Sequence, residues 1–309
     1  MSSPEHAIKD SVKNALDYFL TKLEVEIPTY ERDTALERRV DEIIRSYPGA
    51  KPTHPHIVTA IVIAITGYQH IQSFDAKVLI AVYTAIATTL DSPEVLDSLA
   101  SRDFHRRFCA GAAQHDDDML GQLARLMVTF WDHYPRYAAS SAMASTLEFV
   151  NISILENTSH GMIMSSDSLP FIEYRRAKSG IPEAYAAFIW ERSKFPDEKI
   201  YLQAVPDAML YIDYVNDIMS FYKEESSNEE GTYLRDRARA TGKTPLEALY
   251  ELIDEVVTAA NRARKILGEG PAREAWECFM KGYIAFHTSS PRYRLHEIMD
   301  VHYIMTTGA

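Results

Sequence analysis

Apolar residues recur at intervals of three and four through most of the sequence, and this periodicity constrains the fold more than any other feature. Such spacing gathers apolar side chains on one face of an α-helix, whereas the alternation and the Asn-Gly or Asp-Gly turns of β-hairpins are nearly absent. The sequence therefore predicts an all-α protein. We expect helices over about residues 55–71, 75–90, 117–133, 137–156, 168–191, 197–226, 244–267 and 271–288.

The chain is predicted to form one domain covering residues 1–309, with about residues 1–30 as a peripheral N-terminal segment. No internal repeat, low-complexity tract or linker rich in Pro, Gly and Ser divides it. Hydrophobic residues make up 46% of the composition, which is enough for a sizeable core. A disordered chain is therefore not expected.

Charge and composition exclude several classes of function. The net charge of −12 argues against a nucleic-acid-binding protein, because phosphate backbones are held by an excess of Lys and Arg. Residues 57–65 and 78–90 are the most apolar runs, and both are shorter than the roughly 20 residues that span a bilayer, so no membrane span is expected. The first residues lack the apolar stretch of a secretory signal, and the two cysteines form no C-x-x-C pair. We expect a cytoplasmic protein.

Residues 214–224 carry the strongest sign of chemistry. Asn216, Ser220 and Glu224, the oxygen trio, follow one another at intervals of four, so each step turns only about 40° around the helix axis and all three share one face. Their amide, hydroxyl and carboxylate oxygens are ligands of the kind that Mg²⁺ takes when it also bridges phosphates. A solvated polar stripe is the alternative interpretation. Apolar residues just before the trio, among them Met209 and Ile212, favour a buried helix, where a metal or ligand explains polar groups that would otherwise be costly.

The oxygen trio, together with Asp217 and Lys223, resembles the N-D-x-x-S-x-x-K-E metal-binding signature of the fungal trichodiene synthase family of sesquiterpene cyclases. Residues 277–283 (ECFMKGY) and 292–295 (RYRL) continue the resemblance, which spans roughly residues 55–300. It implies a class I terpenoid synthase fold, a helical bundle around an apolar cavity, and a homodimer. It also implies that three Mg²⁺ ions help to ionise farnesyl diphosphate, whose carbocation then cyclises to a sesquiterpene hydrocarbon as diphosphate is released.

The same resemblance assigns roles to single residues. The oxygen trio would hold one metal, and basic groups would bind the diphosphate. The residues that match those groups are Lys223, Arg292 and Tyr293. Arg175 precedes a helix break at residues 179–182 (Ser-Gly-Ile-Pro), where proline disrupts the expected helix, and this layout matches the family's diphosphate-sensing arginine. A surface arginine pair, Arg175 with Arg176, is the alternative.

The family's second metal motif, an Asp-rich D-D-x-x-D run at the end of a core helix, is incomplete here. Leu90 falls at the first aspartate position, Asp91 at the second and Glu94 at the last acidic position. Leucine cannot ligate a cation, so Asp91 and Glu94 are the expected ligands of the remaining metals, with water and diphosphate oxygens completing each shell. Two alternatives stay open, a register that places Asp91 first and a simple helix stop. The acidic run at 116–118 lacks a preceding apolar helix, so we interpret it as a helix N-terminus.

Aromatic residues on the core helices should line the substrate pocket, because the face of a π system stabilises a carbocation without capturing it. The candidates are Tyr68, Tyr83, Phe149 and Tyr214. Plain core packing is the alternative for each of them. A simple product of 1,11 ring closure, of the humulene type, is one expectation for the reaction.

Two other functions remain as rivals. A chain-elongating prenyltransferase of similar fold would show two D-D-x-x-D motifs, and this sequence shows neither. A degenerate helical protein that binds a prenyl ligand or a partner without catalysis is favoured by Leu90 and opposed by the intact oxygen trio.

Overall fold

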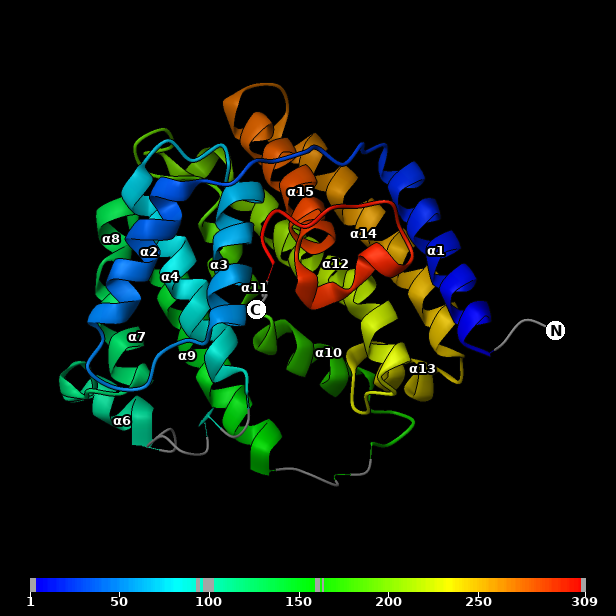
Figure 1. The fold of residues 1–309 in the computed structure, drawn as a ribbon, viewed down its shortest axis with the longest axis horizontal. Helices are drawn as coiled ribbons and strands as arrows, with labels where there is room; N and C mark the ends of the chain where they lie inside the picture. Colours follow the sequence, from blue (N-terminus) through cyan, green and yellow to red (C-terminus); the bar gives the residue numbers. More distant parts are fainter. Residues whose placement is uncertain (1–3, 93–94, 97–102, 159–161, 163, 307–309) are drawn as a thin grey trace.

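A computed structural model describes residues 4–92, 95–96, 103–158, 162 and 164–306 (Figure 1). Across these residues the secondary structure is α-helix and short 3-10 turns, with no strand, which confirms the predicted all-α fold. The α-helices are α1 (Pro4–Leu23), α2 (Thr34–Ser46), α3 (His54–Thr66), α4 (Phe74–Leu90), α6 (Phe104–Cys109), α7 (Met119–Val128), α8 (Phe130–His133), α9 (Arg136–Thr158), α10 (Leu169–Ser179), α11 (Pro182–Ala187), α12 (Val205–Ser226), α13 (Tyr233–Thr241), α14 (Pro245–Leu267) and α15 (Pro271–Ser289). The 3-10 turns are η2 (Ala113–His115), η3 (Glu198–Ile200), η4 (Leu202–Ala204), η5 (Pro291–Tyr293) and η6 (Leu295–Glu297).

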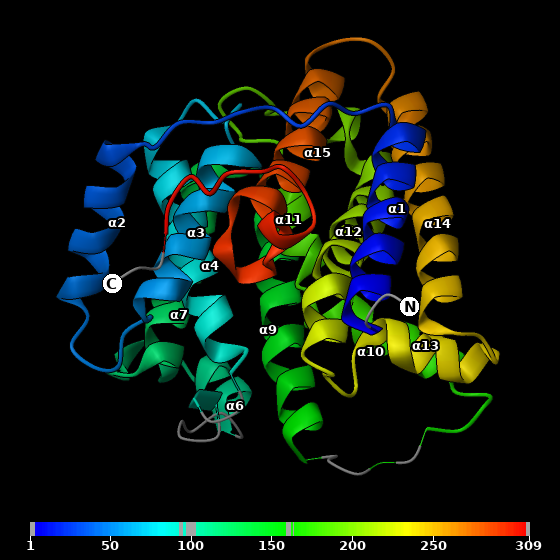
Figure 2. The same ribbon diagram turned by 45° about the vertical axis from the view of Figure 1, so that its right-hand side comes forward.

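Helices α4, α3, α15, α12, α11 and α9 surround the centre of the molecule and form a ring (Figures 1 and 2). Helix α4 packs against α3, α3 against α15, α15 against α12, α12 against α11 and α11 against α9. The ring closes between α9 and α4, where the hydroxyl oxygens of Tyr83 and Thr146 lie 2.7 Å apart. Helices α1 and α14 pack on the outside of α12, and α2 and α7 pack on α4.

Helices α3 and α4 are core helices because apolar residues occupy every side of them. The hydroxyl of Ser73 caps α4 by accepting a hydrogen bond from the Ala76 N–H, as the sequence pattern indicates. Helix α3 ends at Thr66, earlier than the predicted residue 71. The Glu191 carboxylate accepts hydrogen bonds from the N–H groups of Gln72 and Ser73, and these bonds hold the chain out of the helix between α3 and α4.

The helix break predicted near residues 179–182 is present, between α10 and α11. Ile181 has a left-handed backbone with φ of +51°, and Pro182 begins α11, where its missing N–H removes no helical hydrogen bond. A side chain at Gly180 would collide with the Asp213 carboxylate, so the break packs directly on α12. The predicted helix over residues 117–133 is also divided, into α7 and α8. Asp118 caps α7 by accepting from the Gly121 N–H at 2.8 Å, so the acidic run is a helix start, as we interpreted it.

Helix α1 contributes to the core although it lies at the outside of the bundle in Figure 1. It packs against α14 and α12 through one buried face. The buried residues of that face are Val12, Ala15, Leu16, Phe19 and Leu23. The N-terminal segment is therefore anchored by apolar packing rather than loosely appended.

One described helix, over residues 136–156, is long and apolar enough to cross a membrane by length and composition alone. The core helix of a soluble protein passes the same test, and 56% of the most apolar window of this helix is buried inside the molecule. It belongs to α9, which packs against α11 and α10.

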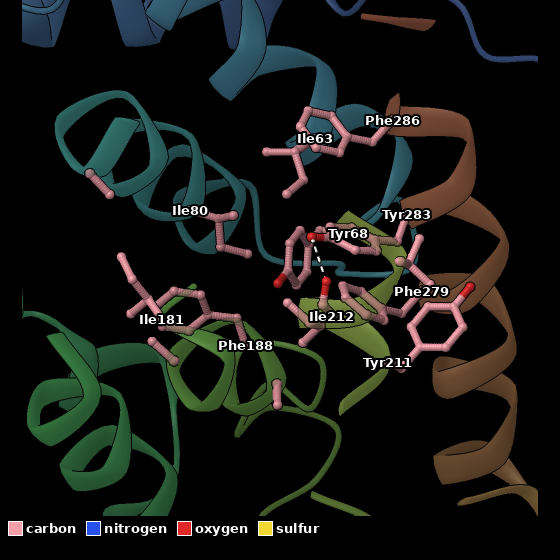
Figure 3. Packing of buried hydrophobic residues seen from close by; sticks show 14 of the residues in the cluster. Ile63, Tyr68, Ile80, Ile181, Phe188, Tyr211, Ile212, Phe279, Tyr283 and Phe286 are labelled. Atoms are coloured by element: carbon pink, nitrogen blue, oxygen red, sulfur yellow. Dashed lines mark hydrogen bonds between the residues drawn. The ribbon is translucent and has the colours of Figure 1, made fainter. Parts of the chain in front are cut away.

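An aromatic ladder runs along α15 and joins the core to the centre of the ring (Figure 3). The rings of Trp276, Phe279, Tyr283 and Phe286 follow one another with centroids 6.2, 5.4 and 5.8 Å apart. A side chain at Gly282 would collide with the backbone of Thr66, so this glycine permits the close approach of α15 to α3. The Tyr283 hydroxyl donates to the Ile212 carbonyl at 3.2 Å and ties the ladder to α12.

Candidate active site

A cavity of about 350 Å³ lies inside the ring and is lined by both apolar and charged side chains. On α12 its lining runs from Ile212 through Asn216 to Glu224, and on α4 it runs from Thr84 to Asp91. Because the Asp91 side chain is 57% exposed, the charged end is the mouth. The apolar end is lined by Ile63, Phe149, Ile181, Tyr185, Ile212, Tyr283 and Phe286.

The oxygen trio lies on one face of α12, as its spacing predicts. Asn216 and Glu224 line the cavity, and the buried Ser220 hydroxyl lies behind them, where it donates to Glu224 Oε1 at 2.6 Å. Burial raises the pKa of Glu224 to about 7, against the opposing effect of the Ser220 hydrogen bond. No arginine or lysine in the described ranges forms an ion pair with this carboxylate, so its charge lacks a cationic partner within the protein.

The Asn216 side chain is held by contacts with His287 and Tyr293. Its Nδ2 atom lies 3.2 Å from the Tyr293 hydroxyl and 3.3 Å from His287 Nε2. Burial lowers the pKa of His287 to about 3 and raises that of Tyr293 to about 12, so both side chains are neutral near pH 7. These contacts join the trio to the end of α15 and to η5.

The α4 side of the mouth carries fewer described side chains that could bind a metal. Asp91 follows the last residue of α4, and its Oδ2 atom lies 3.8 Å from Arg292 Nη2. Leu90 is fully buried in the core and is not part of the cavity lining, so the position that matches the first aspartate does not contribute to the mouth. Glu94, the other expected ligand, lies outside the described residues. Within the described part of the chain, no three His, Cys, Asp or Glu side chains cluster closely enough to form a metal site by themselves.

Arg175 and Arg176 both line the cavity, but each is already engaged. Arg175 Nη2 donates to Asp236 at 2.6 Å. Arg176 Nε lies 2.8 Å from Asp217 Oδ2, and its Nη1 lies 3.0 Å from Asp213 Oδ1. This network was not predicted from the sequence, although two aspartates four residues apart on an apolar helix indicate a buried cation nearby.

Lys223 is not part of the cavity lining, although it contacts Glu229, which is. Its Nζ atom pairs with Glu229 Oε2 at 3.5 Å, and no part of it lines the mouth. Adjacent helical residues point about 100° apart, so Lys223 is turned away when Glu224 faces inward. The predicted contact between Lys223 and the diphosphate stays a prediction, whereas Arg292 and Tyr293 line the mouth as expected.

Only one of the four predicted pocket aromatics, Phe149, lines the cavity. The other three lie outside it because their hydroxyls bind partners elsewhere in the core. Tyr68 donates to the Tyr185 carbonyl at 2.7 Å, and Tyr83 pairs with Thr146. Tyr214 donates to Glu173 at 2.8 Å and stacks on Tyr233. The aromatics that line the cavity and were not predicted are Tyr185, Tyr233, Tyr283 and Phe286.

The residues at the mouth fit magnesium. Asn216, Glu224 and Asp91 offer amide and carboxylate oxygens to the cavity, the ligands that Mg²⁺ prefers. A partly buried carboxylate without a cationic partner is unfavourable, and a bound cation removes that penalty. Arg292 adds a positive charge beside the same opening for a negatively charged ligand.

Comparison with known proteins agrees with this site. The profile of the trichodiene synthase (TRI5) family matches residues 39–308. Monoterpene synthase 25 from Postia placenta is 44% identical over 293 residues, covering 95% of this chain and 88% of the relative. Terpene synthase 29 from the same fungus is 44% identical over 292 residues, covering 94% and 86%.

Among solved structures, linalool/nerolidol synthase from Streptomyces clavuligerus in complex with 2-fluorogeranyl diphosphate superposes with a TM-score of 0.62. The match covers 87% of this chain and 99% of that one at 13% identity, so it shows the shared fold. The family match and the fold confirm the resemblance found in the sequence. The chain is an enzyme, a terpene synthase, and it belongs to the trichodiene synthase family.

Proposed function

We propose that this terpene synthase converts farnesyl diphosphate to a cyclic sesquiterpene hydrocarbon and diphosphate. The observation that carries the proposal is the layout of the cavity, which joins a mouth bearing Asn216, Glu224 and Arg292 to an interior of aromatic and aliphatic side chains. A substrate with an anionic head and a long hydrocarbon chain matches both ends. In the reaction the carbon–oxygen bond to diphosphate breaks, a new carbon–carbon bond forms, and loss of a proton restores neutrality.

Arg292 lies at the diphosphate end of the cavity. Among the described residues, its one ion-pair contact is the long one to Asp91, so its guanidinium can turn to bind phosphate oxygens through two N–H groups. Tyr293 adds a hydroxyl beside it. We assign Arg175 as the diphosphate sensor at the start of the helix break, and Arg176 as the residue that ties this break to α12.

Class I terpene synthases generally use Mg²⁺, and we propose three ions for this protein. The oxygen trio would hold one ion, and Asp91, with Glu94, would hold the others. Bound Mg²⁺ neutralises the charge that develops on the departing diphosphate. The chain's own contribution is to present these oxygens in a fixed arrangement before the ion binds.

The interior end protects the carbocation. The faces of Phe149, Tyr185, Tyr283 and Phe286 offer π density, and the apolar lining excludes water that would capture the cation. The Tyr185 hydroxyl donates to Thr84 Oγ1 and the Tyr283 hydroxyl donates to the Ile212 carbonyl. Burial raises the pKa of both hydroxyls above the ordinary value, so neither forms a nucleophilic phenolate near pH 7. A 1,11 ring closure of the humulene type is our proposal for the first cyclisation.

Geranyl diphosphate is a second candidate substrate. The cavity of about 350 Å³ lies near the lower end of the roughly 300–1,000 Å³ that is typical of ligand pockets, which favours a shorter chain. The relative named Monoterpene synthase 25 supports the same candidate. Both substrates carry a diphosphate that would bind at the mouth, so they differ only in the length of hydrocarbon chain that the interior must hold.

Incubation of the purified protein with geranyl, farnesyl and geranylgeranyl diphosphates, each with and without Mg²⁺, tests the proposal. Hydrocarbon analysis should detect a Mg²⁺-dependent cyclic product from farnesyl diphosphate. A product from geranyl diphosphate alone would select the second candidate. Absence of a Mg²⁺-dependent product from all three would contradict both.

We further propose that the enzyme acts in the cytoplasm as a homodimer of single-domain chains. Sedimentation equilibrium over a range of concentrations tests the dimer, because a single species with the mass of the monomer would contradict it.

A further inference from the structure

His287 is a buried side chain at the end of α15 that has no role in the chemistry described above. Its ring is completely buried, and Nε2 lies 3.3 Å from the side-chain nitrogen of Asn216. We propose that His287 is a positioning residue that orients the Asn216 carboxamide, so that the amide oxygen faces the cavity. This inference rests on the proposed function, in which that oxygen is a metal ligand.

The hydrogen bonds of His287 define its tautomer. Nδ1 lies 2.7 Å from the Tyr283 carbonyl oxygen, which can only accept, so Nδ1 carries the proton. No Asp or Glu in the described ranges contacts the ring, and a fully buried imidazole without a carboxylate partner is neutral. Nε2 therefore presents a lone pair to Asn216 and can only accept.

This lone pair decides which way the Asn216 amide points. One amide hydrogen of Asn216 is donated to His287 Nε2, and the other is donated to the Tyr293 hydroxyl at 3.2 Å. A carboxamide turned by 180° would place its oxygen against the Nε2 lone pair and lose the bond to His287, whereas the Tyr293 hydroxyl can bond to either end of the amide. Asparagine by itself has no such preference, because its oxygen and nitrogen ends have nearly the same shape.

Packing holds the imidazole itself in place. The His287 ring centroid lies 4.7 Å from that of Tyr283, 4.7 Å from that of Phe286 and 4.4 Å from that of Tyr293. Three aromatic rings thus clamp the imidazole. Through His287, the aromatic ladder of α15 fixes the orientation of Asn216 on α12. Residues behind a metal ligand commonly support metal sites in this way.

Two substitutions separate the hydrogen bonds of His287. His287→Asn places an amide nitrogen near the position of Nδ1, so it can keep the bond to Tyr283 but loses the acceptor that faces Asn216. His287→Gln places an amide oxygen near the position of Nε2 and keeps that acceptor. Mn²⁺ with inorganic diphosphate, titrated by electron paramagnetic resonance, reports metal affinity without turnover. Thermal unfolding monitors stability in parallel.

We expect His287→Asn to weaken Mn²⁺ binding about 10–100-fold, the usual effect of losing a supporting hydrogen bond at a metal site. His287→Gln should stay within about threefold of wild type. His70→Asn is the control, because His70 is half-buried and bonded through Nε2 to the Ile189 carbonyl, but lies outside the cavity lining. It should lower stability and leave Mn²⁺ affinity unchanged.

Wild-type affinity in His287→Asn would overturn the proposal. Equal losses of affinity in both His287 variants, in step with lower stability, would overturn it too, since they indicate a structural role alone. If the variants do not fold, ¹⁵N spectra of the histidine rings in wild-type protein still decide the point. A proton on Nε2 of His287 would refute it. A wild-type protein that fails to bind Mn²⁺ with diphosphate would instead contradict the proposed function, whatever the tautomer.

Discussion

The two sides of the cavity mouth are built differently. On α12, Asn216 is held by two hydrogen bonds, Ser220 is bonded to Glu224, and the neighbouring Asp217 is locked by Arg176. On α4, Asp91 is the single described acidic residue at the cavity, and its one ion-pair contact, to Arg292, is 3.8 Å long. The ligands on the α12 side are therefore fixed before a metal binds, whereas the α4 side has one exposed and weakly paired carboxylate.

This difference suggests a division of labour. Oxygens that are already fixed lose little freedom when an ion binds, so the α12 side should supply most of the metal affinity. The α4 side has a single exposed carboxylate, and the diphosphate itself can complete the shells of ions held there. The incomplete aspartate motif is therefore compatible with metal binding if α12 dominates.

Removing a ligand on each side gives the largest expected contrast. Glu224→Ala should lower turnover about 10²–10³-fold, because a preorganised charge at the leaving group is lost. Asp91→Ala should lower it only about tenfold, since an exposed ligand can be replaced by water. Steady-state rates at saturating Mg²⁺, with circular dichroism to verify helical content, measure the contrast. Equal losses in the two variants would refute the division between the two sides.

Restoring the missing aspartate tests the register of the α4 motif. Leu90 is fully buried, so Leu90→Asp places a carboxylate in the core and should destabilise the protein by about 3 kcal/mol or more without raising activity. Leu90→Asn has nearly the same shape without the charge and separates the effect of ionisation from that of lost packing. Urea unfolding measures both variants. Higher Mg²⁺ affinity in Leu90→Asp would show instead that this position can face the metals.

The parts of the site that depend on local spacing could be predicted from the sequence. Intervals of four placed Asn216, Ser220 and Glu224 on one face, and a proline located the helix break. The predicted pocket positions of Tyr68, Tyr83 and Tyr214 were wrong, because their orientation depends on partners that local spacing does not reveal. Tyr68, for example, bonds to the carbonyl of Tyr185, 117 residues away.

His287 was overlooked for a similar reason. Its partner Asn216 is 71 residues away in sequence, and a lone histidine on an apolar helix gives no local sign of a role. The choice among aromatic residues for the cavity had the same limit. Periodicity identifies which residues are buried, but only the packing of several helices determines which of them face an internal space.

The smallest expected effect concerns the charge of Glu224 in the metal-free protein. Its pKa is about 7 in the folded state, against 4.5 as the ordinary value, so between these pH values the folded state keeps a proton that the unfolded state has released. Stability should therefore fall as the pH rises from about 4.5 to about 7. Glu224→Gln cannot ionise, and without metal it should be more stable than wild type by about 2 kcal/mol at pH 8 but not at pH 4.5.

Urea unfolding with a chelator at the two pH values measures this difference, and Glu269→Gln, a change at a fully exposed side chain, is the control. Adding Mg²⁺ with diphosphate should reverse the order of stability at pH 8, because the wild-type carboxylate then gains a cationic partner and the glutamine does not. The equivalent change on the open side, Asp91→Asn, should show no such reversal, since the exposed Asp91 carboxylate is already hydrated. A reversal of equal size at Asp91 would mean that the two sides of the mouth bind metal alike, whatever their difference in burial.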